Sequence, residues 1–136
     1  MTHAEVVSRA LALTNDPREK IPEEELAELF VPDVVLDMTA RVFNPLVYEG
    51  YEGLHQYRVD LREVWQEVAF HPQELIEEGD RVLAITRMTG SGRGSGVPID
   101  EGGAALYRLD GGRIDHVRFL GASRDEAVAE LREQPG

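Results

Sequence analysis

The chain has 136 residues, a length that suits one domain with a core large enough to fold without disulfides or metal. It contains no cysteine, which excludes disulfides, thiol nucleophiles and thiolate metal sites. Its 26 acidic and 14 basic residues give a net charge of −12, which disfavours nucleic acid and anionic membranes as partners.

The first residues predict a helix rather than a targeting signal. Thr2 and Glu5 have the spacing of a capping box, and the helix that follows, to about residue 14, places Val6, Ala10 and Leu13 on one face. No basic segment leads into an apolar run, and no stretch approaches membrane-spanning length. We therefore expect a cytoplasmic protein.

A second helix and a first strand follow. Pro22 suits the first position of a helix whose buried stripe is Leu26, Leu29 and Phe30. Residues 34–39 are rich in β-branched and apolar residues and predict a strand. Alternation places Val34, Leu36 and Met38 on one face of this strand and Val35 and Asp37 on the other. Residues 40–50 are expected to form a loop with at most a short strand.

The next segment predicts an amphipathic helix and an edge strand. After Gly53, apolar residues recur at spacings of three and four: Leu54, Tyr57, Leu61, Val64 and Trp65. Residues 68–76 then read as a strand. Pro72 lies within it and cannot donate a ladder hydrogen bond, which indicates an edge position or a bulge.

Residues 79–121 predict an antiparallel meander, because three strand-forming runs are separated by Gly-rich and Asp-Gly turns. In its first strand, two apolar faces alternate: Val82, Ala84 and Met88 on one, Leu83 and Ile85 on the other. We expect both faces to be covered, one by helices of this chain and the other by a partner subunit. Ser123 and Glu126 then mark the start of a closing helix.

The order of elements is typical of an α+β protein with helices gathered on one face of a curved sheet. Five segments in this order carry a resemblance: residues 28–37 (ELFVPDVVLD), 48–54 (YEGYEGL), 75–82 (LIEEGDRV), 90–100 (GSGRGSGVPID) and 109–114 (LDGGRI). The chain resembles the cone-shaped fold of the nuclear transport factor 2 (NTF2-like) superfamily. Within that superfamily it is similar to the SnoaL-like branch, whose relatives include polyketide cyclases, ketosteroid isomerase and limonene epoxide hydrolase. The resemblance covers residues 1–136 as one domain.

The resemblance implies a pocket between the concave sheet face and the helices, and a homodimer formed through the other sheet face. It does not fix a reaction, since this scaffold hosts enzymes and binding proteins. At the positions of the ketosteroid isomerase base, tyrosine and donor acid stand Met38, Ala10 and Ala105. At the two acids of limonene epoxide hydrolase stand Thr89 and Phe119, although Arg87 matches its arginine. The catalytic residues of these relatives are therefore not retained.

The resemblance places a set of apolar and aromatic ligand-binding residues in the pocket: Leu36, Met38, Tyr57, Trp65, Ile85, Tyr107, Val117 and Phe119. Arg87 is the charged residue expected among them, and it must pair with an internal carboxylate such as Glu74 or Asp37, or with a ligand. Asp37 would reach the base position if the strand register slipped by one residue. His55 is a further acid or base candidate at the pocket mouth.

Two hypotheses follow. The first is an isomerase, cyclase or hydratase acting on a small hydrophobic cyclic or carbonyl compound, with Arg87 as electrostatic stabiliser and Asp37 or His55 as base. The second is a non-catalytic module that binds an apolar ligand or dimerises. The four histidines have no metal-ligand spacing, so neither hypothesis includes a metal or a cofactor.

Overall fold

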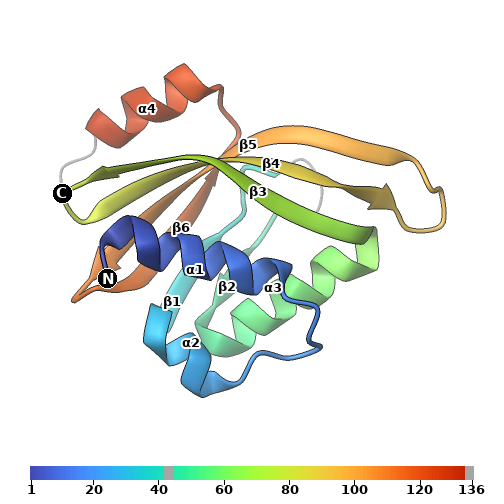
Figure 1. The fold of residues 1–136 in the computed structure, drawn as a ribbon, viewed down its shortest axis with the longest axis horizontal. Helices are drawn as coiled ribbons and strands as arrows, with labels where there is room; N and C mark the ends of the chain where they lie inside the picture. The colour runs from blue at the N-terminus through green and yellow to red at the C-terminus, as the bar shows by residue number, and fades with distance from the viewer. Residues whose placement is uncertain (42–44, 134–136) are drawn as a thin grey trace.

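The protein is described here by a computed structural model that covers residues 1–41 and 45–133. Over these residues it is an α+β fold with four helices and one six-stranded sheet (Figure 1). The elements are α1 (His3–Asn15), α2 (Glu23–Leu29), β1 (Phe30–Asp37), β2 (Val47–Glu49), α3 (Gly50–Val64), β3 (Trp65–Glu78), β4 (Arg81–Gly92), β5 (Pro98–Asp110), β6 (Arg113–Leu120) and α4 (Arg124–Glu133).

The sheet has the strand order β2-β1-β6-β5-β4-β3. β3 to β6 form the predicted antiparallel meander, while β1 pairs parallel with β6 and antiparallel with β2. β3 is longer than expected and lies at the sheet edge, and its register with β4 shifts between Pro72 and Glu74. The two alternatives that Pro72 indicated, an edge position or a bulge, are therefore both present.

The helices α1, α2 and α3 lie on one face of the sheet (Figure 1). α1 begins with the predicted capping box, in which Thr2 accepts from the Glu5 backbone N–H and the Glu5 carboxylate accepts from that of Thr2. Its buried side chains join the main core with those of α2, β1 and β6, including Val7, Leu29 and Ile114. None of the described helices is both long and apolar enough to cross a membrane.

The fourth helix lies on the opposite face of the sheet, which corrects the expectation that all helices gather on one face (Figure 1). Ala127 and Leu131 of α4 pack in a second core cluster with Leu83 of β4 and Leu106 of β5. This packing explains why β4 is apolar on both faces. It also means that α4 occupies part of the face at which a partner subunit was expected.

Candidate functional site

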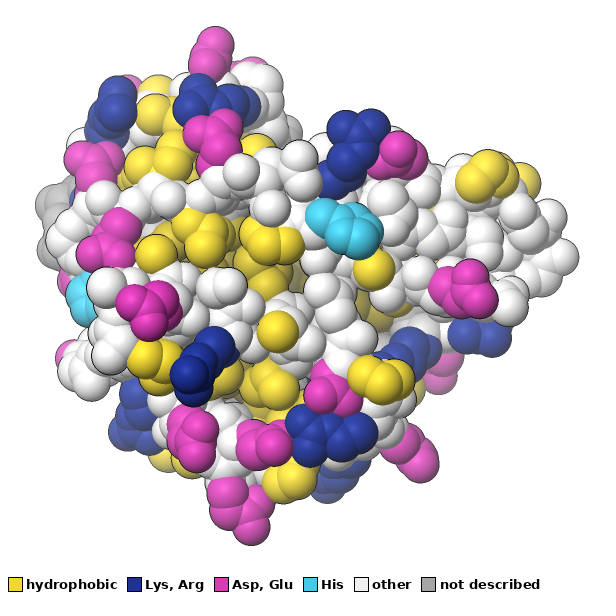
Figure 2. Space-filling model, in the orientation of Figure 1, with side chains coloured by type: hydrophobic (Ala, Val, Ile, Leu, Met, Phe, Trp, Pro, Cys, Tyr) yellow, Lys and Arg dark blue, Asp and Glu magenta, His cyan; other side chains and the backbone are white. Residues whose placement is uncertain are grey.

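A cavity of about 530 Å³ lies between the sheet and the helices α1, α2 and α3. This volume is in the range of pockets that hold small organic molecules. Figure 2 shows hydrophobic side chains recessed between sheet and helices, with charged groups around them. Much of the wall is apolar or aromatic, with contributions from Leu11, Leu26, Phe30, Leu54, Leu61, Phe70 and Met88.

The structure places seven of the eight expected ligand-binding residues on the cavity wall: Leu36, Met38, Tyr57, Trp65, Tyr107, Val117 and Phe119. Met38, rather than Asp37, therefore lies at the cavity on the β1 side. Ile85 is the exception, since it packs in the second cluster on the other face of the sheet. From β4, Thr86 and Met88 reach the cavity instead, because adjacent residues of a strand point to opposite faces.

The expected catalytic residues Arg87, Asp37 and His55 are not on the cavity wall. The side chain of Arg87 is 55% exposed, and its Nε and Nη2 donate to the Asp100 carboxylate at 2.5 and 3.1 Å. Arg87 shares the strand parity of Ile85, so the expectation that it faces the cavity is wrong for the same reason. Its partner is neither of the carboxylates proposed for it from the sequence.

Asp37 and His55 are held elsewhere. The Asp37 carboxylate accepts from the backbone N–H and the hydroxyl of Thr39 at 3.0 and 2.6 Å, and these bonds lower its pKa. A carboxylate stabilised in its charged form at a turn is a weak base. His55 is half-buried on α3 and does not line the cavity. A base near the cavity must therefore come from another residue.

One charged network does reach the cavity, and it joins the segment after β1 to α3. Arg41 Nη2 donates to the Tyr48 hydroxyl at 3.2 Å, and that hydroxyl donates to Asp60 Oδ2 at 2.6 Å. Gln56 donates to the other Asp60 oxygen at 2.7 Å. Arg41 and Asp60 both line the cavity. Tyr48 is buried, and burial followed by its bond to Asp60 raises its pKa.

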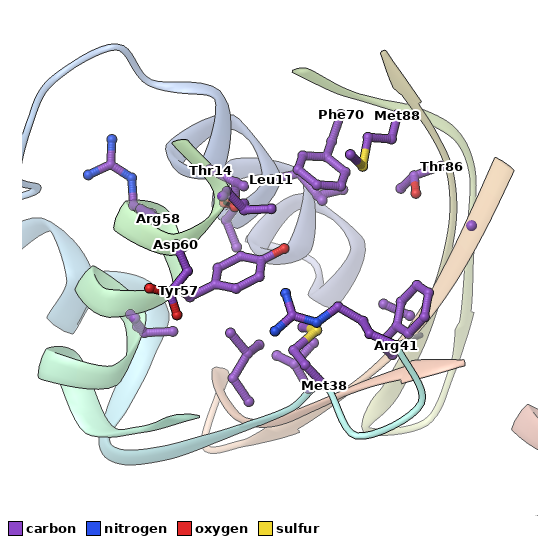
Figure 3. A pocket seen from close by; sticks show the side chains of 18 of the residues that line it. Leu11, Thr14, Met38, Arg41, Tyr57, Arg58, Asp60, Phe70, Thr86 and Met88 are labelled. Carbon is purple, nitrogen blue, oxygen red and sulfur yellow. Dashed lines mark hydrogen bonds between the residues drawn. The ribbon is translucent and has the colours of Figure 1, made fainter. Parts of the chain in front are cut away.

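The aromatic ring of Tyr57 completes this end of the cavity. It meets the Tyr48 ring edge to face at 5.6 Å between centroids, and Arg41 Cζ lies 5.8 and 6.0 Å from the centroids of Tyr48 and Tyr57. These distances are within the range of cation–π contact. In Figure 3 the Tyr57 hydroxyl and the Arg41 guanidinium project into the same cavity from opposite walls.

Two tyrosine hydroxyls at the cavity have no hydrogen-bond partner among the described residues, those of Tyr57 and Tyr107. Burial raises the pKa of Tyr57 to about 12, and it raises that of Tyr107 as well. Both phenols are therefore neutral donors at physiological pH. A phenol at the cavity that has no protein partner can donate to or accept from a bound molecule, so this pair is suited to hydrogen bonding with a ligand.

Arg58 adds a second positive charge next to the cavity. It is 6% exposed, and within the described part of the chain its guanidinium donates only to backbone carbonyl oxygens, those of Asp16, Arg18 and Glu19. No carboxylate of the described residues lies within 4 Å of it. Its pKa is lowered, first by burial and then by Arg62.

The two missed residues differ in how far sequence patterns could have indicated them. Asp60 follows Tyr57 by one helical turn, so extending the predicted helix face would have included it. Arg41 had no such signal, because it lies after the strand in a segment without periodicity. Among the described residues, no three His, Asp or Glu side chains are grouped closely enough to hold a metal ion.

Comparisons with known proteins agree with this fold, an α+β arrangement of helices and one mostly antiparallel sheet. The SnoaL-like domain family matches residues 17–117, and the chain belongs to this family. A comparison with curated proteins gives no match.

Solved structures share the fold over nearly the whole chain. One is a hypothetical protein with a ketosteroid isomerase-like fold from Catenulispora acidiphila in complex with trimethylamine, with 18% identity, 96% and 98% coverage of this chain and that one, and a TM-score of 0.73. Another is a putative SnoaL-like polyketide cyclase from a Jannaschia species, with 20% identity, 98% and 93% coverage, and a TM-score of 0.71. A third is an NTF2-like protein of unknown function from Burkholderia pseudomallei, with 14% identity, 97% coverage of both chains, and a TM-score of 0.70. At these identities the likeness establishes the NTF2-like fold.

Proposed function

We propose that the protein binds a small hydrophobic molecule that carries at least one oxygen atom, and that it binds this molecule in the cavity. The observation that carries the proposal is the pair of cavity hydroxyls, Tyr57 and Tyr107, without protein partners in a wall that is otherwise mostly apolar. An apolar body would bury its surface against the wall, and its oxygen would accept hydrogen bonds from the phenols.

A second candidate function is acid–base catalysis on the same molecule, of the isomerase, cyclase or hydratase type. It is favoured by the Arg41 guanidinium on the cavity wall, a cation that could stabilise developing negative charge, and by the carboxylate of Asp60 beside it. Both Asp60 oxygens accept hydrogen bonds, from Tyr48 and Gln56, so Asp60 would act as a base only when a bound substrate displaces one of these donors. In this proposal, Asp60 and Arg41 take the roles first expected for Asp37 and Arg87. The putative polyketide cyclase with the same fold supports it as an analogy only.

Binding can be tested with the chain's own reporter, because Trp65 is its single tryptophan and lies on the cavity wall. We would titrate cyclohexanone, 2-decalone and a steroid 3-ketone while recording Trp65 fluorescence. We expect a saturable change with at least one of these compounds, since ligand atoms would alter the polarity around the indole ring.

A cavity-filling variant locates the binding. A Cβ added at Gly103 would lie 3.7 and 3.8 Å from Thr86 Oγ1 and the Phe119 ring, ordinary contact distances, so the rest of a leucine side chain would occupy the cavity. Gly102 is the matched control: its backbone also lines the cavity, but a Cβ there meets no atom within 4 Å, and strand alternation directs it to the face opposite that of Gly103. Gly103→Leu should abolish binding and Gly102→Leu should retain it. Equal binding by both variants, or no binding of any compound to the unmodified protein, would contradict the proposal.

Association with a second copy through the sheet face stays a prediction. α4 covers part of that face, so a dimer would use α4 itself or the parts of the face that α4 leaves uncovered.

A further inference from the structure

We propose that the ligand of this cavity is a hydrophobic ring or chain compound that carries a carboxylate, and that Arg41 and the Tyr57 hydroxyl bind this carboxylate. The inference rests on the proposed function and names the chemical class of its ligand.

The first reason is that Arg41 is held in place at the cavity wall. Tyr48 accepts a hydrogen bond from its Nη2, and the rings of Tyr48 and Tyr57 pack against the guanidinium. Tyr48 is itself fixed by Asp60, whose second oxygen is bound by Gln56. A guanidinium has five N–H donors in a rigid plane that matches the two oxygens of a carboxylate. Fixing that plane lowers the entropy that ligand binding would otherwise cost.

The second reason is that Arg41 and Tyr57 offer donors in the same space. The Tyr57 hydroxyl makes no hydrogen bond to any described residue, and it projects into the cavity from α3 (Figure 3). Its raised pKa of about 12 keeps the proton on the phenol, so it donates to an anion rather than repelling it. A cation and a neutral donor together favour a charged acceptor over a neutral one.

The third reason is the local charge. Four charged residues line the cavity: Arg41, Arg58, Asp60 and Glu101. Glu101 is exposed, so solvent screens it, and the rest of the wall then holds two guanidinium groups, the buried Arg58 and the half-buried Arg41, against the one half-buried carboxylate of Asp60. This excess of positive charge lies inside a chain whose net charge is −12. An anionic ligand would balance it in a region of low dielectric, where the interaction is strongest.

The alternative is that Arg41 serves only the protein's own structure, with its charge balanced by Asp60 through Tyr48. The two cases differ in one measurable property. A structural arginine gives no preference for a carboxylate over the isosteric amide, whereas a ligand-binding arginine does.

The test compares matched ligand pairs by isothermal titration calorimetry at pH 7.5. The probes are cyclohexanecarboxylate, adamantane-1-carboxylate and dehydroabietate, each beside its primary amide. For any ring system that fits, we expect the carboxylate to bind at least about tenfold more tightly than the amide, as charge-assisted hydrogen bonds exceed neutral ones.

Variants then assign the preference to its residues. Arg41→Gln should bring the ratio of the two affinities close to one while the amide still binds, which also shows that the variant is folded. Tyr57→Phe should lower the carboxylate affinity without changing Arg41. Arg87→Gln is the control for charge, since it removes the same charge from the outer face and should leave the ratio unchanged.

The outcomes separate this inference from the proposed function. Equal affinities of acid and amide, or a preference that survives Arg41→Gln, would overturn the carboxylate assignment while leaving cavity binding intact. Failure of every acid, amide and ketone to bind would overturn the proposed function itself, and the carboxylate assignment with it.

Discussion

Two tyrosines of the site allow the same chemical change to be made with opposite expected results. Tyr48→Phe removes a hydroxyl that accepts from Arg41 and donates to Asp60, whereas Tyr57→Phe removes one with no partner among the described residues. If Tyr48 is structural and Tyr57 binds ligand, only the first variant should lose stability. The second should lose ligand affinity.

The magnitudes follow from the contacts. Tyr48 is 4% exposed and its 2.6 Å bond is to a charged carboxylate, so its loss should lower the free energy of unfolding by about 2 kcal/mol. Tyr57→Phe breaks no protein hydrogen bond and removes a polar group from an apolar wall, so the free energy of unfolding should stay constant or rise by up to about 1 kcal/mol. The affinity of Tyr57→Phe for a carboxylate ligand should fall about tenfold.

Urea unfolding followed by circular dichroism measures the difference. With a slope of about 2 kcal/mol per M, the midpoints of the two variants should differ by about 1 M urea or more. A Tyr57→Phe midpoint that falls as far as that of Tyr48→Phe would refute the reasoning, because it would give the Tyr57 hydroxyl a structural role.

Two further predictions concern pH and the outer face of the sheet. Tyrosine ionises near pH 10 in an unfolded chain, and the pKa of Tyr57 is raised to about 12 in the folded protein. The stability that comes from keeping Tyr57 neutral is therefore complete below pH 10 and is lost as the pH rises towards 12. Between these two values the free energy of unfolding falls by about 1.4 kcal/mol per pH unit for each tyrosine that ionises only in the unfolded chain. Urea midpoints measured from pH 9 to 11 should show this decline. A midpoint that stays constant over this range would contradict the raised pKa of Tyr57 and the burial that causes it. Separately, Leu131→Ala should cost about 2 to 5 kcal/mol in urea unfolding, because Leu131 is fully buried between α4 and the sheet, and a loss below about 1 kcal/mol would show that α4 does not pack there.

Much of the fold was predictable because local signals agreed with the final structure. The capping box at Thr2, the amphipathic face of α3 and the turns of the meander each have a periodicity or turn chemistry of their own. Pro72 indicated an edge strand or a bulge, since it cannot donate a ladder hydrogen bond, and the structure has both. The helix α4 was predicted, but its face of the sheet was not, because no local pattern encodes which side of a sheet a final helix will cover.

The same limit explains the errors at the site. β4 alternates between two apolar faces, so parity alone did not show that Thr86, and not Ile85 or Arg87, points into the cavity. Arg41 reaches the cavity through tertiary contacts with Tyr48, a residue seven positions later in the chain. Such contacts depend on how β1, β2 and α3 pack, and a single sequence contains no periodic signal for them.

The most direct test of the proposed site is a crystal structure of the protein with dehydroabietate bound, or with whichever probe acid binds most tightly. We predict that the ring system lies in the cavity beside Phe119 and Met38, with the carboxylate in hydrogen-bond contact with Arg41 and the Tyr57 hydroxyl. A ligand bound on the outer face, or one in the cavity whose carboxylate points away from Arg41, would contradict this site.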